Sequence, residues 1–336
     1  MKNIALIGWN GKKNFGDTLM QELLREKLSL HGHVREYSDL STTGLIKGDI
    51  DNSFLNNDIL IFGGGNIISP DFWPFKSLNL IKDQKVYFVN VNVNIDGDNI
   101  ELIKQLQKIN TKWIVRDSKS KSMLSQHNIE SKIIPDICLC NNYNNFNKVP
   151  KQALFFINQY YFGKLFENDI DNFSKCLYNV KIISKHIDWL NSFGWKIIFV
   201  PSQMSEYIDD RIPASFIHRM CKNYATNQWI TKITANETVD LIKKSELVVS
   251  MRLHPALISI SNHIPTIMMS FADKFDNIFA DLNIENILIN MKNLNNDDLV
   301  QLNQTADYMN YREKLDNYFT KYNLNYDDYF KGEFSI

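Results

Sequence analysis

Short apolar stretches alternate with amphipathic stretches along this chain, and this alternation restricts the fold more than any other feature. Stretches of this kind, bounded by Gly, Asn, Asp or Pro, are typical of buried strands, and buried strands separated by helices are typical of a parallel sheet. We therefore expect an α/β protein with doubly wound, Rossmann-like sheets. The predicted strands are Ile4–Gly8, Asp58–Phe62, Val86–Val93, Trp113–Val115, Leu154–Asn158, Trp195–Val200, Leu247–Met251 and Pro265–Phe271.

The length of the chain predicts more than one domain. Its 336 residues exceed what one hydrophobic core ordinarily serves. The stretch Asn141–Pro150 is rich in Asn, Tyr and Phe and lacks a period, so we interpret it as a linker. We expect an N-terminal Rossmann-like lobe over residues 1–145, a C-terminal one over 152–295, and helices over 296–336 that pack back towards the first lobe.

Composition narrows the class of partner and the compartment. The net charge is −1, with 37 Lys and Arg against 38 Asp and Glu, which argues against a nucleic-acid partner. No apolar stretch approaches membrane-spanning length, and the N-terminal residues lack the features of a signal peptide. The four cysteines show neither a disulfide framework nor metal-ligand spacing. We expect a cytoplasmic protein without a metal or a transmembrane segment; peripheral association with the inner membrane face is left open.

The segment from Leu247 to His254 carries the side chains most suggestive of chemistry. An apolar strand ends before Arg252, and Pro255 suits the first position of a helix. The carboxyl ends of parallel strands and the N-termini of helices are where such folds bind anions. Two positions apart in an extended chain, Arg252 and His254 would face the same side. The pattern favours a phosphorylated or carboxylated substrate and a proton to be moved; the alternative is a structural role for both.

Two glycine-containing turns also follow predicted strands. In Asn14-Phe-Gly16-Asp17, the backbone N–H groups could hold an anion. The alternative is an ordinary tight turn, in which Gly16 permits the turn and Asp17 caps the helix Thr18–Leu28. In Gly63-Gly64-Gly65-Asn66, the glycines allow close backbone approach to a ligand or positive φ angles, or else a tight crossover.

A second arginine follows a predicted strand at Arg116-Asp117-Ser118. Arg116 could bind a carboxylate or phosphate through two parallel hydrogen bonds. The alternative for a single arginine is a surface salt bridge.

Taken in order, these segments resemble the polysaccharide pyruvyl transferase family over about Asn3 to Phe279. Among the single pieces only the Arg-Leu-His unit is specific, and the ordered set as a whole is fairly specific. The matching pieces are Asn14–Asp17, Ile61–Gly65, Val115–Ser118, Pro135-Asp136, Val200-Pro201, Asp209-Asp210, Thr234–Glu237, Ser250–His254, Pro265 and Lys274.

The resemblance implies a two-lobed fold similar to the GT-B glycosyltransferases, with the site in a cleft between the lobes. It implies transfer of the pyruvyl group of phosphoenolpyruvate to two hydroxyls of one sugar in a glycan or lipid-linked saccharide, which gives a pyruvate ketal and phosphate without a cofactor. Carried onto this sequence, it makes Arg116 and Arg252 donor-binding residues and His254 the catalytic histidine. We add the substrate-binding candidates Asn14, Gly16, Asp17, Gly64, Gly65, Asn66 and Lys274.

One departure and two alternative functions accompany the resemblance. The family often has a glycine-rich turn where this chain reads Val89-Asn-Val-Asn-Val-Asn94. The alternative enzyme is a nucleotide-sugar-dependent GT-B glycosyltransferase, whose cleft would give similar motifs. The alternative from another class is a non-catalytic glycan or anion sensor.

Overall fold

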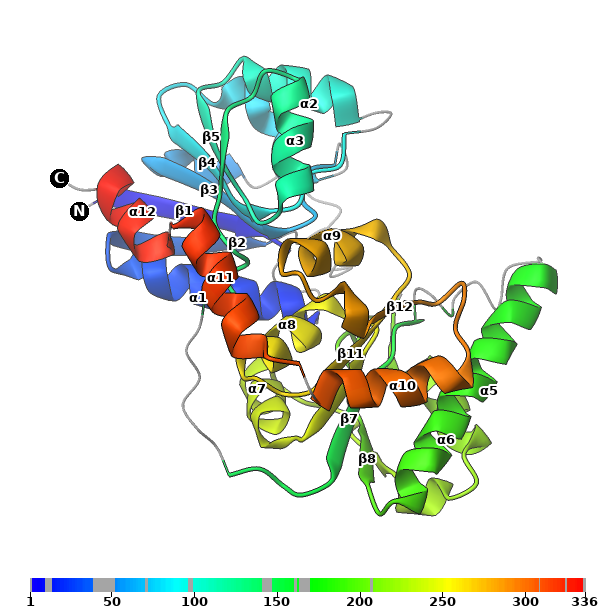
Figure 1. Cartoon of the computed structure of the whole chain (residues 1–336). Helices are drawn as coiled ribbons and strands as arrows, with labels where there is room; N and C mark the ends of the chain where they lie inside the picture. Colours follow the sequence, from blue (N-terminus) through cyan, green and yellow to red (C-terminus); the bar gives the residue numbers. More distant parts are fainter. Residues whose placement is uncertain are drawn as a thin grey trace. The chain divides into compact units, whose positions relative to one another are not determined.

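The computed structural model contains two parallel six-stranded sheets, which confirms the predicted α/β class (Figure 1). It describes residues 2–9, 14–38, 52–69, 72–95, 99–140, 147–159, 162, 170–205, 208–307, 309–323 and 325–334. Within them, the chain divides into two compact units. Unit 1 comprises residues 1–12, 17–140 and 317–336, and unit 2 comprises residues 13–16 and 141–316.

The sheet of unit 1 has the strand order β2-β1-β3-β4-β5-β6. Its strands pair in parallel throughout, for example with Ile4 opposite Ile59. The central strands are buried on both faces, as expected when helices cover a parallel sheet. The strands are β1 (Lys2–Gly8), β2 (Gly32–Ser38), β3 (Ile59–Gly65), β4 (Lys85–Val91), β5 (Thr111–Val115) and β6 (Ser131–Ile133).

The helices of unit 1 connect these strands, except for α12, which follows every strand in the chain. Those that lie wholly or mainly in this unit are α1 (Phe15–Ser29), η2 (Asn52–Asn56), η3 (Trp73–Leu80), α2 (Asn99–Gln107), α3 (Ser118–Gln126) and α12 (Tyr326–Phe334). On one face of the sheet, aromatic rings continue the core from strand to strand. The ring centroids of Phe62 and Phe88 lie 5.1 Å apart, and those of Phe88 and Trp113 lie 4.0 Å apart.

The sheet of unit 2 has the strand order β12-β11-β10-β7-β8-β9, again with parallel pairing. Its strands are β7 (Gln152–Phe156), β8 (Lys196–Phe199), β9 (Gln228–Trp229), β10 (Leu247–Ser250), β11 (Thr266–Ser270) and β12 (Leu288–Asn290). Its helices are α5 (Ile170–Ser192), α6 (Arg211–Met220), η5 (Tyr224–Thr226), α7 (Ala235–Lys244), α8 (Leu253–Ser261), α9 (Asp273–Asp281), η6 (Glu285–Ile287) and α10 (Asn296–Asp307). The helix α11 (Tyr311–Tyr322) begins in unit 2 and ends in unit 1.

Several local predictions are confirmed. The side chain of Thr234 accepts a hydrogen bond from the Glu237 backbone while the Glu237 carboxylate accepts one from the Thr234 backbone, so the predicted capping box opens α7. Gly64 and Gly65 have φ angles of 81° and 76°, the left-handed values that glycine permits.

Other local predictions need correction. The first helix begins at Phe15 rather than Thr18, and Asn14, not Asp17, caps it, because Asn14 Oδ1 accepts a hydrogen bond from the Gly16 N–H at 3.0 Å. Pro255 is the third residue of α8 and not its first. Its missing N–H is harmless there as well, because the first four N–H groups of a helix have no partner within it.

The sequence VNVNVN of residues 89–94 begins in β4 and contains a bulge at Asn90. The register with β5 shifts between Val89 and Val91, and Asn90 has a φ of 58°. Asparagine tolerates this left-handed conformation better than other residues with a side chain. The fully buried Asn90 side chain donates to Met20 Sδ at 3.1 Å and accepts from the Tyr326 hydroxyl at 3.2 Å. Asparagine therefore supplies here the backbone conformation that glycine would allow.

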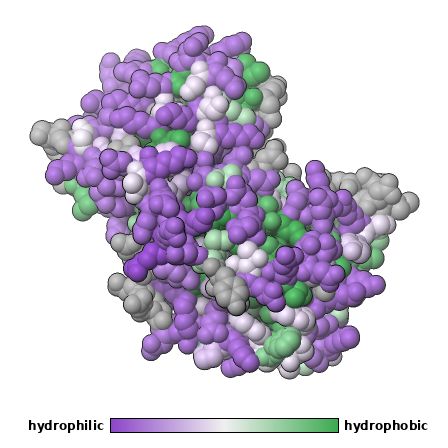
Figure 2. All heavy atoms as spheres, viewed as in Figure 1, coloured by the Kyte–Doolittle hydropathy of each residue, from purple (hydrophilic) through white to green (hydrophobic). Residues whose placement is uncertain are grey.

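No described helix combines the length and the apolar composition that crossing a bilayer requires. The face of the molecule in Figure 2 is largely hydrophilic, and its hydrophobic residues form small areas between polar ones.

Candidate anion site in unit 2

The turn between β10 and α8 is fixed by its own polar groups. The Ser250 hydroxyl accepts a hydrogen bond from the Arg252 N–H at 2.9 Å and donates one to the Arg252 carbonyl at 2.6 Å. The Met251 N–H donates to the carbonyl of Phe156 at the end of β7 at 2.8 Å. Arg252 thus precedes α8 with an extended backbone, and His254 lies in the first helical turn. The prediction that Arg252 and His254 face the same side of one extended strand is therefore wrong, because α8 begins between these two residues.

The side chain of Arg252 is held by two acceptors from other loops of unit 2. Its Nε donates to Asp210 Oδ2 at 3.0 Å, its Nη2 to Asp210 Oδ1 at 2.5 Å, and its Nη1 to Gln203 Oε1 at 3.1 Å. This is a two-point contact between a guanidinium and a carboxylate, which fixes direction as well as charge. The side chain of Arg252 remains 15% exposed and that of Asp210 only 1%.

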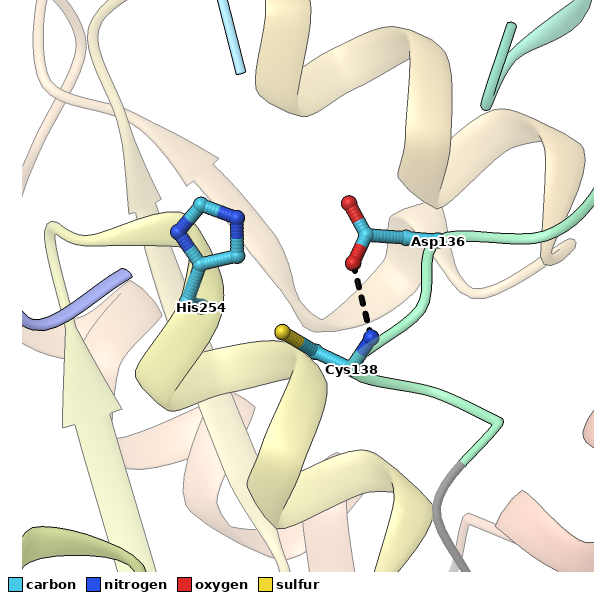
Figure 3. A group of neighbouring side chains, drawn as sticks. All are labelled: Asp136, Cys138 and His254. Atoms are coloured by element: carbon cyan, nitrogen blue, oxygen red, sulfur yellow. Dashed lines mark hydrogen bonds between the residues drawn. The ribbon is translucent and has the colours of Figure 1, made fainter. Parts of the chain in front are cut away.

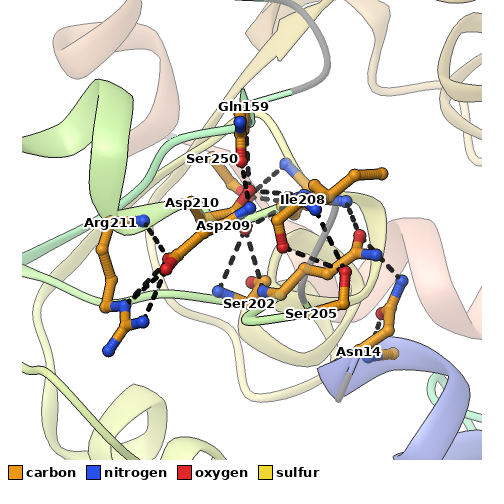
Figure 4. A network of polar contacts seen from close by, with 12 residues as sticks. Asn14, Gln159, Ser202, Ser205, Ile208, Asp209, Asp210, Arg211 and Ser250 are labelled. Carbon is orange, nitrogen blue, oxygen red and sulfur yellow. Dashed lines mark hydrogen bonds and ion pairs between the residues drawn. The ribbon is translucent and has the colours of Figure 1, made fainter. Parts of the chain in front are cut away.

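Asp210 also organises the backbone around Arg252 (Figure 4). Its carboxylate accepts N–H groups from Gln159 at 3.0 Å, Ser202 at 3.2 Å and Gln203 at 3.0 Å. These residues follow β7 and β8, two neighbours in the sheet. One buried carboxylate therefore joins the carboxyl ends of three adjacent strands, because Arg252 follows β10.

The neighbouring Asp209 plays a different part. It accepts hydrogen bonds from the Arg211 backbone at 3.0 Å and from Arg211 Nε at 2.8 Å (Figure 4). These hydrogen bonds hold the pKa of the Asp209 carboxyl below its usual value. In the sequence these two residues stand only as a piece that matches the family, without a predicted structural role. They precede α6, and Asp210 makes no capping hydrogen bond with its own helix.

The segment Asn14–Gly16 belongs to unit 2 and lies beside the same loops. The Phe15 N–H donates to the Ser202 carbonyl at 2.7 Å, and Asn14 Nδ2 donates to Gln203 Oε1 at 3.4 Å. A Cβ atom added at Gly16 would overlap the imidazole of His254. The structure thus brings together four predicted site residues in one unit: Asn14, Gly16, Arg252 and His254.

The other predicted glycines lie in unit 1. A Cβ atom added at Gly65 would lie 3.2 Å from Asp17 Oδ1, so the end of β3 and the first turn of α1 are close neighbours. The carbonyl of the exposed Asn66 accepts a hydrogen bond from Trp9 Nε1 at 3.2 Å. Asp17, Gly64, Gly65 and Asn66 therefore form a local group of their own.

Arg116 is buried against Asp136, also in unit 1. Its Nη1 donates to Asp136 Oδ2 at 3.0 Å, and its carbonyl accepts from the Tyr318 hydroxyl at 3.3 Å. The side chains are 3% and 0% exposed, so the alternative of a surface salt bridge is wrong. Asp136 Oδ1 also accepts the Cys138 N–H at 3.0 Å, as Figure 3 shows. Burial and the nearby Asp136 carboxylate raise the pKa of the Cys138 thiol.

Lys274 is the second residue of α9, but its side chain lies outside the described part of the structure. Sequence reasoning missed Asp210 and Gln203 as partners of Arg252, and Asn90 as the bulge residue. A polar residue after a buried strand was the available signal for Gln203, which follows β8 and Pro201.

Comparison with known families and structures identifies similar proteins. A family model described as polysaccharide pyruvyl transferase matches residues 14–273. No curated protein sequence matches the chain.

Solved structures resemble the whole fold at low sequence identity. The MnaA–UDP co-structure from S. aureus has a TM-score of 0.58 at 10% identity, over 94% of this chain and 90% of that one. The UDP-GlcNAc 2-epimerase from Neisseria meningitidis bound to UDP-GlcNAc has a TM-score of 0.56 at 11% identity, over 97% and 95%. The glycosyltransferase SnogD from Streptomyces nogalater has a TM-score of 0.52 at 10% identity, over 96% and 95%. These likenesses support the two-lobed, GT-B-like α/β fold.

Proposed function

Since this chain belongs to the polysaccharide pyruvyl transferase family, we propose that it transfers the pyruvyl group of phosphoenolpyruvate to two hydroxyls of one sugar in a cell-surface glycan. The family membership supports the coarser activity, a transferase that acts on polysaccharide. The observation that carries the finer proposal is Arg252, which Asp210 and Gln203 hold two residues before His254 at the start of α8.

Arg252 has donors left for an anionic substrate. A guanidinium has five N–H groups, and the contacts to Asp210 and Gln203 within the described residues use three of them. The remaining two suit a carboxylate or phosphate oxygen, with the direction of the group already fixed. The N–H groups of the first turn of α8 favour the same charge. Arg252 is accordingly our proposed donor-binding residue in unit 2.

In the proposed reaction, two hydroxyl groups replace one phosphate. A proton adds to the methylene carbon of phosphoenolpyruvate, which makes it a methyl group and leaves positive charge at the neighbouring carbon. One sugar hydroxyl attacks this carbon, the bond to the phosphate oxygen breaks, and the second hydroxyl closes the ring. Of the two protons that the sugar hydroxyls lose, one replaces the proton that was added to the methylene carbon and the other leaves with phosphate. His254 is the proposed general acid–base.

The remaining candidates keep proposed binding roles. Arg116 would bind an oxygen atom of phosphoenolpyruvate. Its Nε has no hydrogen-bond partner among the described residues, so this N–H group is available in addition to the Nη1 group that contacts Asp136. Asn14 and Gly16 would line the substrate next to His254. Lys274 and the unit 1 group Asp17, Gly64, Gly65 and Asn66 are the other substrate-binding candidates. We propose that no cofactor takes part and that the acceptor is a glycan or lipid-linked saccharide at the cytoplasmic side.

The test is phosphate release from phosphoenolpyruvate in the presence of a panel of glycan acceptors. Mass spectrometry should show an acceptor heavier by one pyruvate less one water. For His254→Ala, whose folding is checked by circular dichroism, we expect a rate about 10²–10⁴ times lower, the usual value of a general acid–base. Unchanged product formation would remove His254 from the chemistry.

The alternative function is transfer from a nucleotide sugar. Its support is the fold alone, which this chain shares with a glycosyltransferase and with UDP-bound proteins. Titration calorimetry separates the two: we expect phosphoenolpyruvate to bind and UDP- or GDP-sugars not to bind. Binding of a nucleotide sugar without phosphoenolpyruvate would favour the alternative.

A further inference from the structure

The exposed large hydrophobic residues are concentrated in one part of unit 2. Among the described residues, eleven such side chains are exposed, and eight of them lie between residues 173 and 224. The other three, Leu30, Leu80 and Ile100, are scattered over unit 1. The eight are Phe173, Leu177, Tyr178 and Phe193 in and just after α5, Ile212, Phe216 and Met220 on α6, and Tyr224 in η5.

Topology places α5 and α6 on the same face of the unit 2 sheet. The chain passes from β7 to β8 through α5 and from β8 to β9 through α6, always in one direction along the sheet. Because such crossovers are right-handed, helices that advance in one direction cover one face. The two helices pack against each other, and Figure 1 shows them as neighbours. Their outer sides therefore form one continuous surface.

The spacing of these residues points them away from the core. On α6, Ile212, Phe216 and Met220 recur every four residues, while Pro213, Ala214 and Ile217 are buried on the neighbouring side of the helix. On α5, Phe173 and Leu177 have the same spacing. Both helices thus already bury an apolar side, and folding of unit 2 does not account for a second one.

Basic side chains predominate between these hydrophobic residues, although Asp188 of α5 lies among them and accepts a hydrogen bond from the Lys222 N–H at 2.8 Å. Neither the stretch 172–187 nor the stretch 211–226 contains an Asp or a Glu. Five basic side chains in them are exposed and make no ion pair within the described residues: Lys175, Lys181, Lys185, Arg219 and Lys222.

We propose that this outer surface of α5, α6 and η5, the α5–α6 surface, binds an anionic membrane. Exposed Phe, Leu, Ile, Met and Tyr side chains would enter the region between the headgroups and the acyl chains, and lysine and arginine would contact lipid phosphates. That combination is typical of helices that lie in the plane of a membrane interface. A second copy of the chain fits less well, because a two-fold interface would set the same basic residues against each other. The proposal is independent of the reaction that the protein catalyses.

The experiment is sedimentation of the full chain with phosphatidylcholine vesicles that contain no anionic lipid or about a third phosphatidylglycerol. We expect binding to the anionic vesicles only, weakened by salt. The double variant Leu177→Ser/Phe216→Ser should abolish it. Lys181→Ala and Arg219→Ala should each lower the partition coefficient about fivefold, the usual effect of one basic residue near such a surface. The matched control is Leu30→Ser, an exposed leucine of unit 1 that should leave binding unchanged.

Other outcomes overturn the proposal. No binding to anionic vesicles excludes a membrane surface. Equal loss of binding in Leu30→Ser would show that the α5–α6 surface is not the contact. Light scattering after size exclusion tests the second copy: a dimer that Leu177→Ser/Phe216→Ser converts to a monomer would assign the surface to self-association instead.

Discussion

Gly16 lies so close to the imidazole of His254 that its position has no room for a side chain. An added Cβ would overlap Nδ1 and two carbons of the ring. Asn14 fixes the same backbone by accepting the Gly16 N–H. Glycine is therefore required here for close approach and not for an unusual backbone angle.

Gly16→Ala should lower the pyruvylation rate at least about tenfold, because the methyl group must displace the imidazole or the first turn of α1, and small displacements of a catalytic group cost this much or more. Gly332→Ala is the matched control, since a Cβ at that helical glycine meets nothing within 4 Å. Steady-state kinetics of both variants check this. Equal activity of the two would show that His254 needs no fixed position.

Asp210→Asn should lower kcat/KM for phosphoenolpyruvate about 10–150-fold, the loss expected when hydrogen bonds to a charged group worth about 1.5–3 kcal/mol are weakened. The reason is that Arg252 would lose its anionic partner and its fixed direction. Asp209→Asn is the control, because Asp209 pairs with the more exposed Arg211 and not with Arg252. Steady-state kinetics of phosphate release by the folded variants measure the effect, and equal kcat/KM values of the two variants would contradict the positioning role.

Among the elements, the predictable strands are those buried at the centre of each sheet. All eight predicted strands exist, and the four that were missed, β2, β6, β9 and β12, are the edges of the two sheets. An edge strand has a neighbour on one side only and is short or partly exposed, so its sequence lacks a continuous apolar run. The bulge in β4 was equally hidden, because Asn90 is one of many asparagines and nothing in the sequence marks the positive φ angle that it adopts.

Exchanging Asn90 separates the backbone effect from the side-chain effect. Asn90→Ala should destabilise the protein by about 2–4 kcal/mol, since alanine pays for a left-handed φ and leaves the buried Tyr326 hydroxyl without its acceptor. Asn90→Gly should cost about 1–2 kcal/mol less than Asn90→Ala, because glycine removes the backbone strain alone. Urea unfolding measures both. Equal stability of the two variants would mean that the φ of 58° is not retained in solution.

For the candidate site, prediction reached single residues but not their partners. Arg252 and His254 could be selected because an apolar strand stops abruptly before them. The role of Asp210 could not, because its partners Gln159 and Arg252 lie 51 and 42 residues away along the chain. In the sequence, a carboxylate that joins strand ends cannot be distinguished from one that caps a helix, because only the folded sheet brings the strand ends together.

For the whole molecule, stability should depend on pH through a buried histidine. His186 is fully buried in α5, with Nε2 3.3 Å from Asn303 Nδ2 of α10. Burial lowers its pKa from 6.5 to about 4. Between these values the unfolded chain binds the proton and the folded chain does not, so the free energy of unfolding falls as the pH falls from about 6.5 to 4, by up to about 3 kcal/mol.

Thermal unfolding at pH 7, 6, 5 and 4.5 tests this expectation. His186→Leu, which removes the titrating group, should unfold with a flatter pH dependence than the parent chain. His33→Gln, a change at an exposed histidine, is the control for the general acid response. Parallel curves for His186→Leu and the parent would rule out His186 as the cause.

The two compact units do not correspond to two uninterrupted halves of the chain. Residues 13–16 belong to unit 2 although unit 1 surrounds them in sequence, and residues 317–336 return to unit 1 after unit 2 is complete. Both passages run through a helix, α1 and α11. A gene split within residues 141–150, where the sequence predicts a linker that lies mainly outside the described residues, would therefore give two incomplete fragments. A chimera that exchanges acceptor or donor specificity with a relative should transplant residues 13–16 together with 141–316.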